Sequence, residues 1–306
     1  MEKRTNPRDV NSCYGTIGPS QDAVDMFFMG NGLAINDPNS GYDETGFSAV
    51  ENHCYDPDYK DKKTDQNISN MYANREPRFY ASVVYQGRSW FKKWMNGNPN
   101  YIVDFSAGGG NDLSNGDNVK GGYMLGKFKN RTVNHASGDT QSWKRVSIIY
   151  RLAEFYLFYA EALNETDPSN PDIIKYIDMV RERAGIPGYQ TMNDNGIKTG
   201  IIGNYDKQFD AIQHERYVEL YCEGQRYFDI RRWMVCGDEG RIGCDQTRFY
   251  GMNMKGSKDK TPGEPTSYYT RTKVENRQWT DKLYLYPIHQ NVIELANGRI
   301  PQNYGW

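Results

Sequence analysis

The sequence has few of the features that mark membrane-spanning or metal-binding proteins. Its mean hydropathy is −0.85, and it contains no apolar run long enough to cross a bilayer, which excludes a transmembrane helix. The 5 cysteines include no C-x-x-C pair, and the 4 histidines are scattered along the chain. These spacings predict neither a zinc site nor a disulfide framework. We favour five free thiols. A disulfide between Cys236 and Cys244 is the alternative.

The chain also lacks a strong excess of either charge and a secretory leader. Its 306 residues carry a formal net charge of −2, so no overall field favours nucleic acid or an anionic membrane as a partner. Residues 1–4 (MEKR) are charged, but no apolar segment follows them, so no signal peptide is predicted. The chain is then either cytoplasmic or a mature or truncated piece. No cofactor and no metal are predicted.

Aromatic residues, in contrast, are abundant, with 24 Tyr, 12 Phe and 6 Trp. We expect most of these rings in the core. The composition also suits a surface that stacks on flat or ring-shaped partners.

The segment 145–233 predicts three or four helices in close succession. Residues 147–163 place apolar side chains at the i, i+3, i+4 and i+7 spacing of a buried helical face, and the other side is apolar too. We therefore expect this helix to be covered on both flanks. Asn170 is placed to cap a second helix over 171–184, which Gly185 ends. The two helices predict an antiparallel hairpin.

The hairpin resembles one tetratricopeptide-repeat unit at residues 159–163 (YAEAL), where small residues let helices approach closely. One such unit cannot bury its own face, and no second unit with the same period occurs in the chain. Its neighbours must be the next helix or something outside this chain.

A third helix, over 206–223, carries Glu215, Glu219 and Glu223 on one stripe, with arginines nearby. Two of these carboxylates could serve as the acid/base pair of a glycoside hydrolase. The alternative is a salt-bridge network that fixes the angle between packed helices. We favour the network, because the glutamates are matched by arginines and lie on one helix rather than across a cleft.

The flanking segments are loop-rich. Short strands are predicted at 78–85, 101–105 and 121–128, and a short helix capped by Ser20 at 21–29. The glycines at 107–110 fail the phosphate-loop pattern, since no Lys-Ser/Thr follows them. Oxygen side chains around them could hold calcium but lack the EF-hand spacing; they are Asp104, Asn111, Asp112, Asn115 and Asp117. After a long polar loop (233–280), a strand-like apolar run at 283–288 suggests that the C-terminus is docked.

Several motifs, in order along the chain, resemble one family: the SusD/RagB glycan-binding outer-membrane lipoproteins of Bacteroidetes. The motifs are 19–25 (PSQDAVD), 74–79 (NREPRF), 151–162 (RLAEFYLFYAEA), 180–185 (VRERAG), 215–224 (ERYVELYCEG), 226–233 (RYFDIRRW), 285–288 (LYPI) and 302–306 (QNYGW). Each motif alone is weak, but the ordered set is specific.

The resemblance implies a mostly α (α+β) fold, with tetratricopeptide-like helices as scaffold and a loop-rich, short-strand face for ligand. It also implies a non-catalytic protein, lipid-anchored on the outer leaflet of the outer membrane and facing outside. Such a protein binds oligosaccharide, or in some members peptide, and hands it to a SusC-like TonB-dependent transporter. The family's N-terminal half, with the lipidation signal and further helices, is not in this sequence. The whole of 1–306 then reads as the C-terminal domain, comprising a loop-rich region (1–144), a helical core (145–234), and a long loop with the tail (235–306).

The matched motifs are scaffold motifs and transfer no binding residues. A sugar ring stacks its apolar face on an aromatic side chain while polar side chains bind its hydroxyls, and loops on a rigid scaffold are where such residues gather. The loop after residue 87 has this mixture, so we predict a ligand site at Arg88, Trp90, Trp94, Asn98 and Tyr101. Alternatively, the two tryptophans form one apolar side of a short helix that packs inward. Tyr268 and Tyr269 are a weaker second candidate.

Three functions follow from these observations. The first is glycan binding beside a transporter. The second is a peptide-binding tetratricopeptide adaptor, which would need several repeats in tandem. The third is a glycoside hydrolase that uses the helical glutamates.

Overall fold

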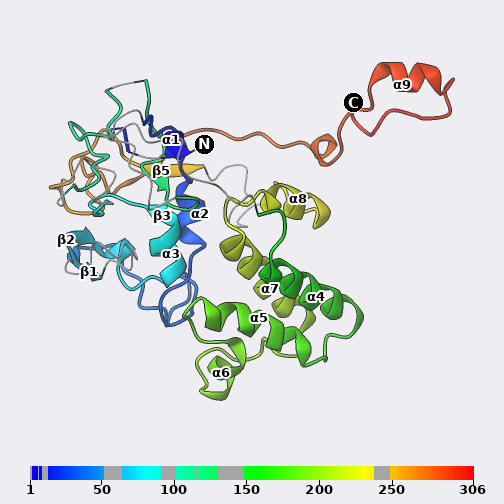
Figure 1. Cartoon of the computed structure of the whole chain (residues 1–306), viewed down its shortest axis with the longest axis horizontal. Coiled ribbons are helices and arrows are strands. Elements are labelled where there is room, and N and C mark those ends of the chain that lie inside the picture. The colour runs from blue at the N-terminus through cyan, green and yellow to red at the C-terminus, as the bar shows by residue number, and fades with distance from the viewer. Residues whose placement is uncertain are drawn as a thin grey trace.

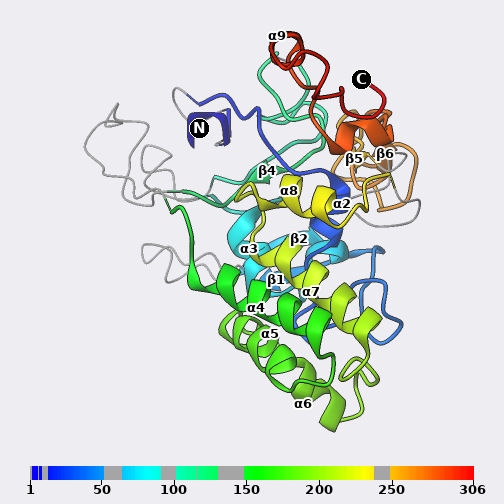
Figure 2. The ribbon, with the colours of Figure 1, turned by 90° about the vertical axis from the view of Figure 1, so that its right-hand side faces the viewer.

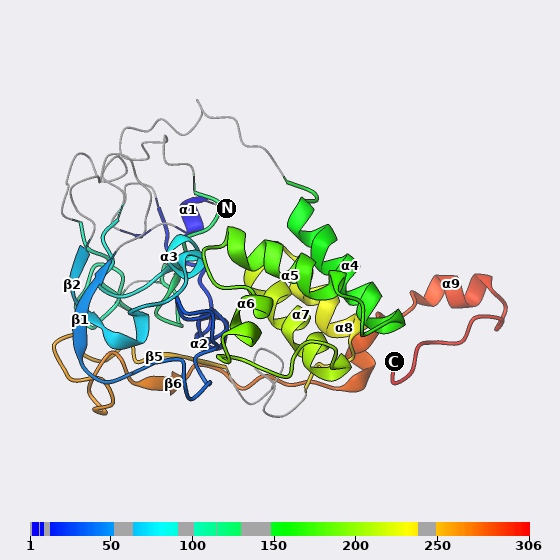
Figure 3. The ribbon, with the colours of Figure 1, turned by 90° about the horizontal axis from the view of Figure 1, so that it is seen from below.

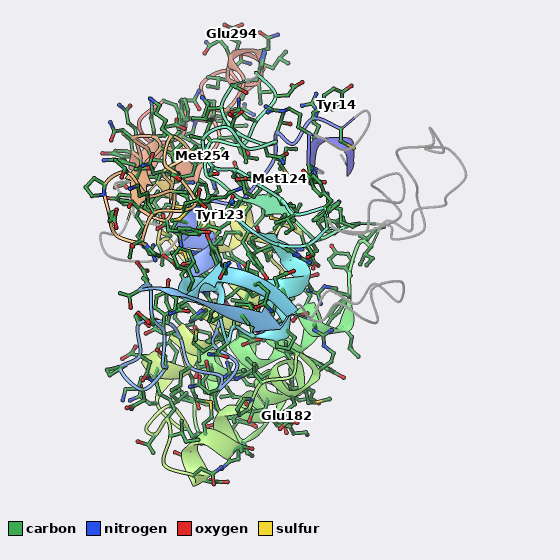
Figure 4. All side chains as sticks on the ribbon, turned by 90° about the vertical axis from the view of Figure 1, so that its left-hand side faces the viewer. Tyr14, Tyr123, Met124, Glu182, Met254 and Glu294 are labelled. Atoms are coloured by element: carbon green, nitrogen blue, oxygen red, sulfur yellow. The ribbon has the colours of Figure 1, made fainter. Side chains whose placement is uncertain are left out.

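The computed structural model describes residues 2–5, 7–8, 13–51, 64–90, 101–114, 116–129, 148–237 and 249–306. These residues form a loop-rich lobe with short strands, a helical lobe, and a C-terminal arm that projects from both (Figure 1). In Figure 4, Met254 marks the loop-rich lobe, Glu182 the far end of the helical lobe, and Glu294 the arm. The described part is mostly helical with a few short strands, which confirms the predicted fold class.

The helical lobe contains α4 (Leu152–Thr166), α5 (Asp172–Arg183), α6 (Tyr189–Asp194), α7 (Tyr205–Glu219) and α8 (Gln225–Arg232). The helix α4 packs against α5 and α7, as Figures 2 and 3 show from two sides. Asn170 accepts a 3.0 Å hydrogen bond from the amide of Asp172 at the start of α5. The predicted hairpin is confirmed, and its core holds Leu157, Ala160, Ile173, Ile177 and Ile212.

The third predicted helix is shorter than expected. It ends at Glu219 instead of residue 223, because Leu220 leaves the α-helical region (φ −94°, ψ 19°), and Cys222 (φ 58°) and Gly224 (φ 90°) are left-handed. Glycine adopts a left-handed φ without steric cost. The chain therefore turns at Gly224 and starts the separate helix α8.

The loop-rich lobe is built on three antiparallel pairs of strands. These are β1 (Phe47–Glu51) with β2 (Thr64–Ser69), β3 (Val83–Val84) with β4 (Met124–Leu125), and β5 (Tyr250–Met252) with β6 (Arg271–Lys273). The lobe also holds α1 (Glu2–Thr5), α2 (Gln21–Asp25) and the 3-10 helix η2 (Asn70–Tyr72). The predicted cap of α2 is confirmed, since Ser20 accepts a hydrogen bond from the amide of Ala23. Side chains from residues 13–125, which include α2, and from residues 252–269 pack into one hydrophobic core. These two segments lie side by side in the loop-rich lobe (Figure 1).

The prediction of one strand over 78–85 is wrong for its first part. Residues 77–82 form the helix α3 (Pro77–Ser82), and only Val83 and Val84 are in a strand. Pro77 occupies the first helical turn, where a proline suits helix formation. Phe79 and Tyr80 are both buried, although an alternating strand would have exposed one of them.

The C-terminal arm also differs from its prediction. It contains the 3-10 helix η5 (Asp281–Tyr284) and α9 (Gln290–Leu295), and no strand at 283–288. The contacts near its base reach the helical lobe, where the Tyr284 hydroxyl donates a 3.0 Å hydrogen bond to the carbonyl of Cys236. Beyond this base the expected docking is not seen, because α9 projects away from both lobes (Figures 1 and 3) and Leu295 is 83% exposed.

Candidate functional site

The segments on either side of 91–100 are joined by an isolated antiparallel bridge between Ser89 and Ile102. The Gly87 amide donates a 3.0 Å hydrogen bond to the carbonyl of Val103, and the Trp90 amide donates one of the same length to the carbonyl of Tyr101. Asp65 on β2 accepts a hydrogen bond from the hydroxyl of Ser89. The residues on either side of 91–100 are therefore held together and clamped to the loop-rich lobe.

Two of the predicted site residues, Arg88 and Trp90, flank Ser89 of this bridge, and their side chains are buried. Arg88 is 1% exposed, and its guanidinium donates a hydrogen bond to the carbonyl of Val83. Trp90 is 2% exposed, with Arg88 5.9 Å from its ring centroid and the Lys129 ammonium 5.8 Å away. Inward packing, the alternative given for the tryptophans, thus describes Trp90. Trp94 and Asn98 lie outside the described residues, so the site on this loop stays a prediction.

Tyr101, the remaining predicted residue, lies beside a polar cluster formed by the turn that follows. Its hydroxyl accepts a 3.1 Å hydrogen bond from the amide nitrogen of Asn111. Asp104 accepts hydrogen bonds from Gln86 at 2.8 Å and from Lys258 at 2.6 Å. Burial raises the pKa of Asp104, but the hydrogen bonds from Lys258 and its neighbours outweigh this and lower it. The cluster is therefore a charged, internally bonded support at the loop's C-terminal end.

The cluster is not arranged as a metal site. Asp112 accepts from its own turn at Ser114 and Gly108 and pairs with Arg8 at 3.3 Å, while Lys258 pairs with Asp104. Within the residues that the structure describes, no group of three or more potential acidic, histidine or cysteine ligands could hold an ion.

The second aromatic candidates for a ligand site, Tyr268 and Tyr269, are buried, as Trp90 is.

Glu215 and Glu219 on α7, and Glu223 in the turn after it, form a charge network between the lobes. Glu215 contacts Arg78 at 2.5 Å and Arg181 at 3.3 Å. Glu219 lies 3.0 Å from the same Arg78 and 2.5 Å from Arg183. Arg151 pairs with both Glu219 and Glu223, and Lys127 pairs with Glu223. We call these residues the interlobe network, since Arg78 and Lys127 belong to the loop-rich lobe.

The charge states in the interlobe network favour support over catalysis. Burial alone would raise the pKa of Glu219, but Arg78 and Arg151 outweigh it and lower the pKa to about 2. A general acid at neutral pH needs a raised pKa instead. Glu215 and Glu219 lie on one helix, Glu223 lies just beyond its end, and all three are bonded to cations. The geometry agrees with the salt-bridge interpretation given from the sequence.

A second polar set joins α8 to the hairpin. Asp229 accepts two hydrogen bonds from Arg216, at 3.0 and 2.9 Å. Arg232 and Trp233 both donate to Glu161 on α4, each at 2.7 Å. These contacts hold α4, α7 and α8 against each other, and they account for the many charged residues in the segment 215–233.

Sequence reasoning missed one bridge within the loop-rich lobe. Arg271 on β6 pairs with Asp25 on α2 at 2.6 Å and with Glu44. Gln21 accepts a hydrogen bond from the hydroxyl of Tyr123, which in turn lies 3.0 Å from the hydroxyl of Tyr72. Partners separated by up to 246 positions leave no local pattern that could have predicted this contact.

A single histidine should make folding sensitive to mild acid. The ring of His214 stacks on Phe28 with centroids 4.1 Å apart, and Nε2 lies 2.6 Å from the carbonyl oxygen of Met26. Burial lowers the pKa of His214 from 6.5 to about 4. Between these values the unfolded chain binds a proton that the folded chain does not, so stability is lost as pH falls from 6.5 towards 4.

We therefore expect the midpoint of thermal unfolding to fall over this range, and His214→Gln to flatten the profile. Calorimetry at half-unit pH steps measures this. The Glu219 carboxylate adds its own loss only below pH 4.5, as pH falls towards its folded value of about 2. A variant profile that is parallel to the wild type between pH 6.5 and 4 would exclude His214 as the source.

Comparison with known proteins adds the family. The chain matches the SusD family over residues 1–306. The SusD-like protein P2 of Formosa agariphila is 37% identical over 82 residues, which are 27% of this chain and 16% of that protein. A solved SusD-like protein of Bacteroides fragilis (BF3747) is 27% identical with a TM-score of 0.67, and the solved protein BT4246 is 23% identical with a TM-score of 0.75.

The match covers 99% of this chain and 50% of each of those two solved chains, so this chain spans about half their length. Among the described residues, no helix has both the length and the apolar character needed to cross a membrane. Because the family match extends over all 306 residues, the chain belongs to the SusD family.

Proposed function

We propose that this chain is part of a non-catalytic glycan-binding protein of the bacterial cell surface. It binds oligosaccharide or polysaccharide and delivers it to a SusC-like TonB-dependent transporter in the outer membrane. The protein sits on the outer leaflet, held by a lipid anchor. Membership of the SusD family, over all 306 residues, is the observation that carries this proposal.

Three features of the chain support a binding role. Glu215, Glu219 and Glu223, the carboxylates that a hydrolase would use, are bonded to arginine and lysine side chains. The residues on either side of 91–100 are bonded to each other, and Ser89 is bonded to Asp65 of β2. The chain spans half the length of its solved relatives, so a further N-terminal half of the protein would complete the site.

We place the ligand on this loop, with Trp94, Asn98 and Tyr101 as the contacting residues. Arg88 and Trp90 hold the base of the loop from the inside. A peptide ligand is the main alternative. A tetratricopeptide adaptor is less favoured, because the described residues contain one such hairpin and not a tandem array.

The test is isothermal titration of the purified chain with a panel of plant, host and microbial polysaccharides, followed by analysis of the mixture for released sugars. We expect saturable heat with at least one glycan and no product. The variant Glu219→Gln should bind equally well and unfold at a lower temperature, because it loses charge pairing in the interlobe network.

Two results would contradict the proposal. Sugar release by the wild type that Glu219→Gln abolishes, at an unchanged unfolding temperature, would make the chain a glycoside hydrolase. Binding of a peptide library with no response to any glycan would make it a peptide-binding protein.

A further inference from the structure

Two aromatic rings, those of Tyr14 and Phe128, lie on the surface of the loop-rich lobe. They are 45% and 46% exposed, and we call them the ring pair. In Figure 4, Tyr14 lies at the outer edge of the lobe, whereas the labelled Tyr123 and Met124 belong to its buried core. Single exposed aromatic residues are common on protein surfaces, so exposure alone does not indicate a site.

The backbone of Phe128 is strained. Its φ of 63° lies in the left-handed region, where a bulky side chain is a genuine outlier. Such strain persists only where surrounding contacts hold it, and it is concentrated at ligand-binding and active sites. A glycine at this position would adopt the same φ without steric cost.

The two lysines that flank Phe128 hold it in this conformation. The Lys127 ammonium donates to two backbone carbonyls at the C-terminal end of α7, at 3.2 and 3.1 Å. The Lys129 ammonium lies 5.8 Å from the centroid of the buried Trp90 ring. Both lysine side chains thus reach into the protein, while the ring between them stays at the surface.

The segments that carry the two rings run antiparallel to each other. At one end, the Leu125 amide donates a 3.4 Å hydrogen bond to the carbonyl of Ile17. At the other end, burial lowers the pKa of Lys129 well below its usual value, and the nearby Cys13 thiol acts in the opposite direction. Between these two contacts, the rings of the pair occupy neighbouring positions on the two segments.

The ring pair adjoins the base of the loop at 91–100. Lys129, which contacts the Trp90 ring, directly follows Phe128 in the chain. The Trp90 amide in turn donates a hydrogen bond to the carbonyl of Tyr101, just after the loop. The ring pair and Tyr101 are thus joined through Trp90. A glycan on the loop can reach the ring pair once it is several sugar units long.

We propose that the ring pair binds a further sugar unit of the glycan that the loop at 91–100 contacts. The inference rests on the proposed function and specifies its ligand, a chain long enough to be bound at two places. Each ring offers an uncharged apolar face on which a sugar can stack. Two linked contacts on one ligand raise its affinity beyond that of either contact alone. The strained backbone keeps the Phe128 ring outside while its neighbours are bonded inside.

The first experiment is hydroxyl-radical footprinting of the 306-residue chain. Without glycan, Tyr14 and Phe128 should be oxidised about as fast as Tyr205, which is 40% exposed in the helical lobe. The probes are starch, pectin, chondroitin sulfate and yeast mannan. With whichever of them gives saturable heat, oxidation of the ring pair should fall at least about threefold, because a bound sugar covers the exposed faces. Oxidation of Tyr205 should not change.

The second experiment is titration of variants with the same polysaccharide and with its shorter fragments. Phe128→Gly removes the ring and the strain together, so its unfolding midpoint should be equal to or above that of the wild type. It should bind the polysaccharide at least about threefold more weakly, with a smaller loss for the shortest fragment that binds. Phe128→Tyr keeps the ring and should keep the affinity, and Tyr205→Ala is the matched control.

The inference is overturned if either ring is already protected from oxidation without glycan, because another part of the protein then covers it. Equal affinity of the wild type, Phe128→Gly and Tyr14→Ala for the polysaccharide would also exclude it. A loss in Phe128→Gly that is the same for every fragment length would mean that the ring pair does not bind a separate sugar unit. In the last two results the wild type still binds glycan, so the proposed function stands, whereas absence of heat with every polysaccharide would overturn both.

Discussion

Replacing Glu215 by alanine is expected to lower the free energy of unfolding by about 3–5 kcal/mol, the cost of breaking a buried ion pair. Glu215 is fully buried and accepts from Arg78 and Arg181, whose side chain is also fully buried. Arg181 would keep its hydrogen bonds to the carbonyls of Pro187 and Gly32. Its charge would lose the carboxylate that compensates it, in a site closed to water.

Urea unfolding, followed by circular dichroism, measures this change as a lower midpoint at an unchanged slope. Glu215→Gln keeps the shape of the side chain and removes only its charge, so it should fall between the wild type and Glu215→Ala. The matched control is Lys175→Ala, which breaks the exposed pair of Lys175 with Asp172 and should leave the midpoint unchanged. A loss below about 1 kcal/mol for Glu215→Ala would mean that the interlobe network does not join the lobes.

The network also shows which parts of the fold the sequence could predict. The spacing of the glutamates and the arginines near them were enough to predict salt bridges, but not the partners. Arg216, which is nearby, pairs with Asp229. The partners from α5, Arg181 and Arg183, lie 34 and 36 positions away. Arg78, which bonds both Glu215 and Glu219, lies 137 and 141 positions away. A pattern within one helix cannot identify such a partner, because the contact depends on how the two lobes pack.

Local patterns predicted the helical hairpin because its apolar spacing, its turn and the Asn170 cap all agree. They failed at 78–85, where an alternating apolar pattern and a proline pointed to different structures. Proline at the first helical turn prevailed, since both Phe79 and Tyr80 could be buried by a helix. The prediction that α4 is covered on both flanks is wrong within the described residues, where Leu152 and Phe155 are more than half exposed.

The candidate site shows the same limit. Aromatic and polar residues in one loop predict sugar binding by their composition, but composition does not say which ring faces inward. Trp90 pairs its backbone with Tyr101, and its side chain points into the loop-rich core. Hence Arg88 and Trp90 are not available to a ligand. An experiment must therefore separate loss of binding caused by unfolding from loss of binding caused by a missing ligand contact.

Trp90→Ala is expected to lower the free energy of unfolding by about 3–5 kcal/mol, the usual cost of deleting a large buried ring. Trp90 is packed in the core of the loop-rich lobe, with the cations of Arg88 and Lys129 5.9 and 5.8 Å from its ring centroid. Glycan binding should weaken in this variant in proportion to the unfolded fraction, and binding should return when temperature is lowered. Denaturant unfolding and titration of the same sample measure the two effects together.

The informative contrast is with the predicted contact residues. If the loop binds glycan, Trp94→Ala and Tyr101→Ala should each weaken binding at least about tenfold, which corresponds to about 1.4 kcal/mol. Tyr101→Phe, which removes only the hydroxyl that accepts from Asn111, should keep the stacking surface and most of the affinity. Because Trp90 supports the loop from inside, a chain in which Trp90→Ala abolishes binding while its unfolding midpoint is unchanged would contradict the buried role. Equal affinity in Trp94→Ala, Tyr101→Ala and the wild type would instead place the ligand away from this loop.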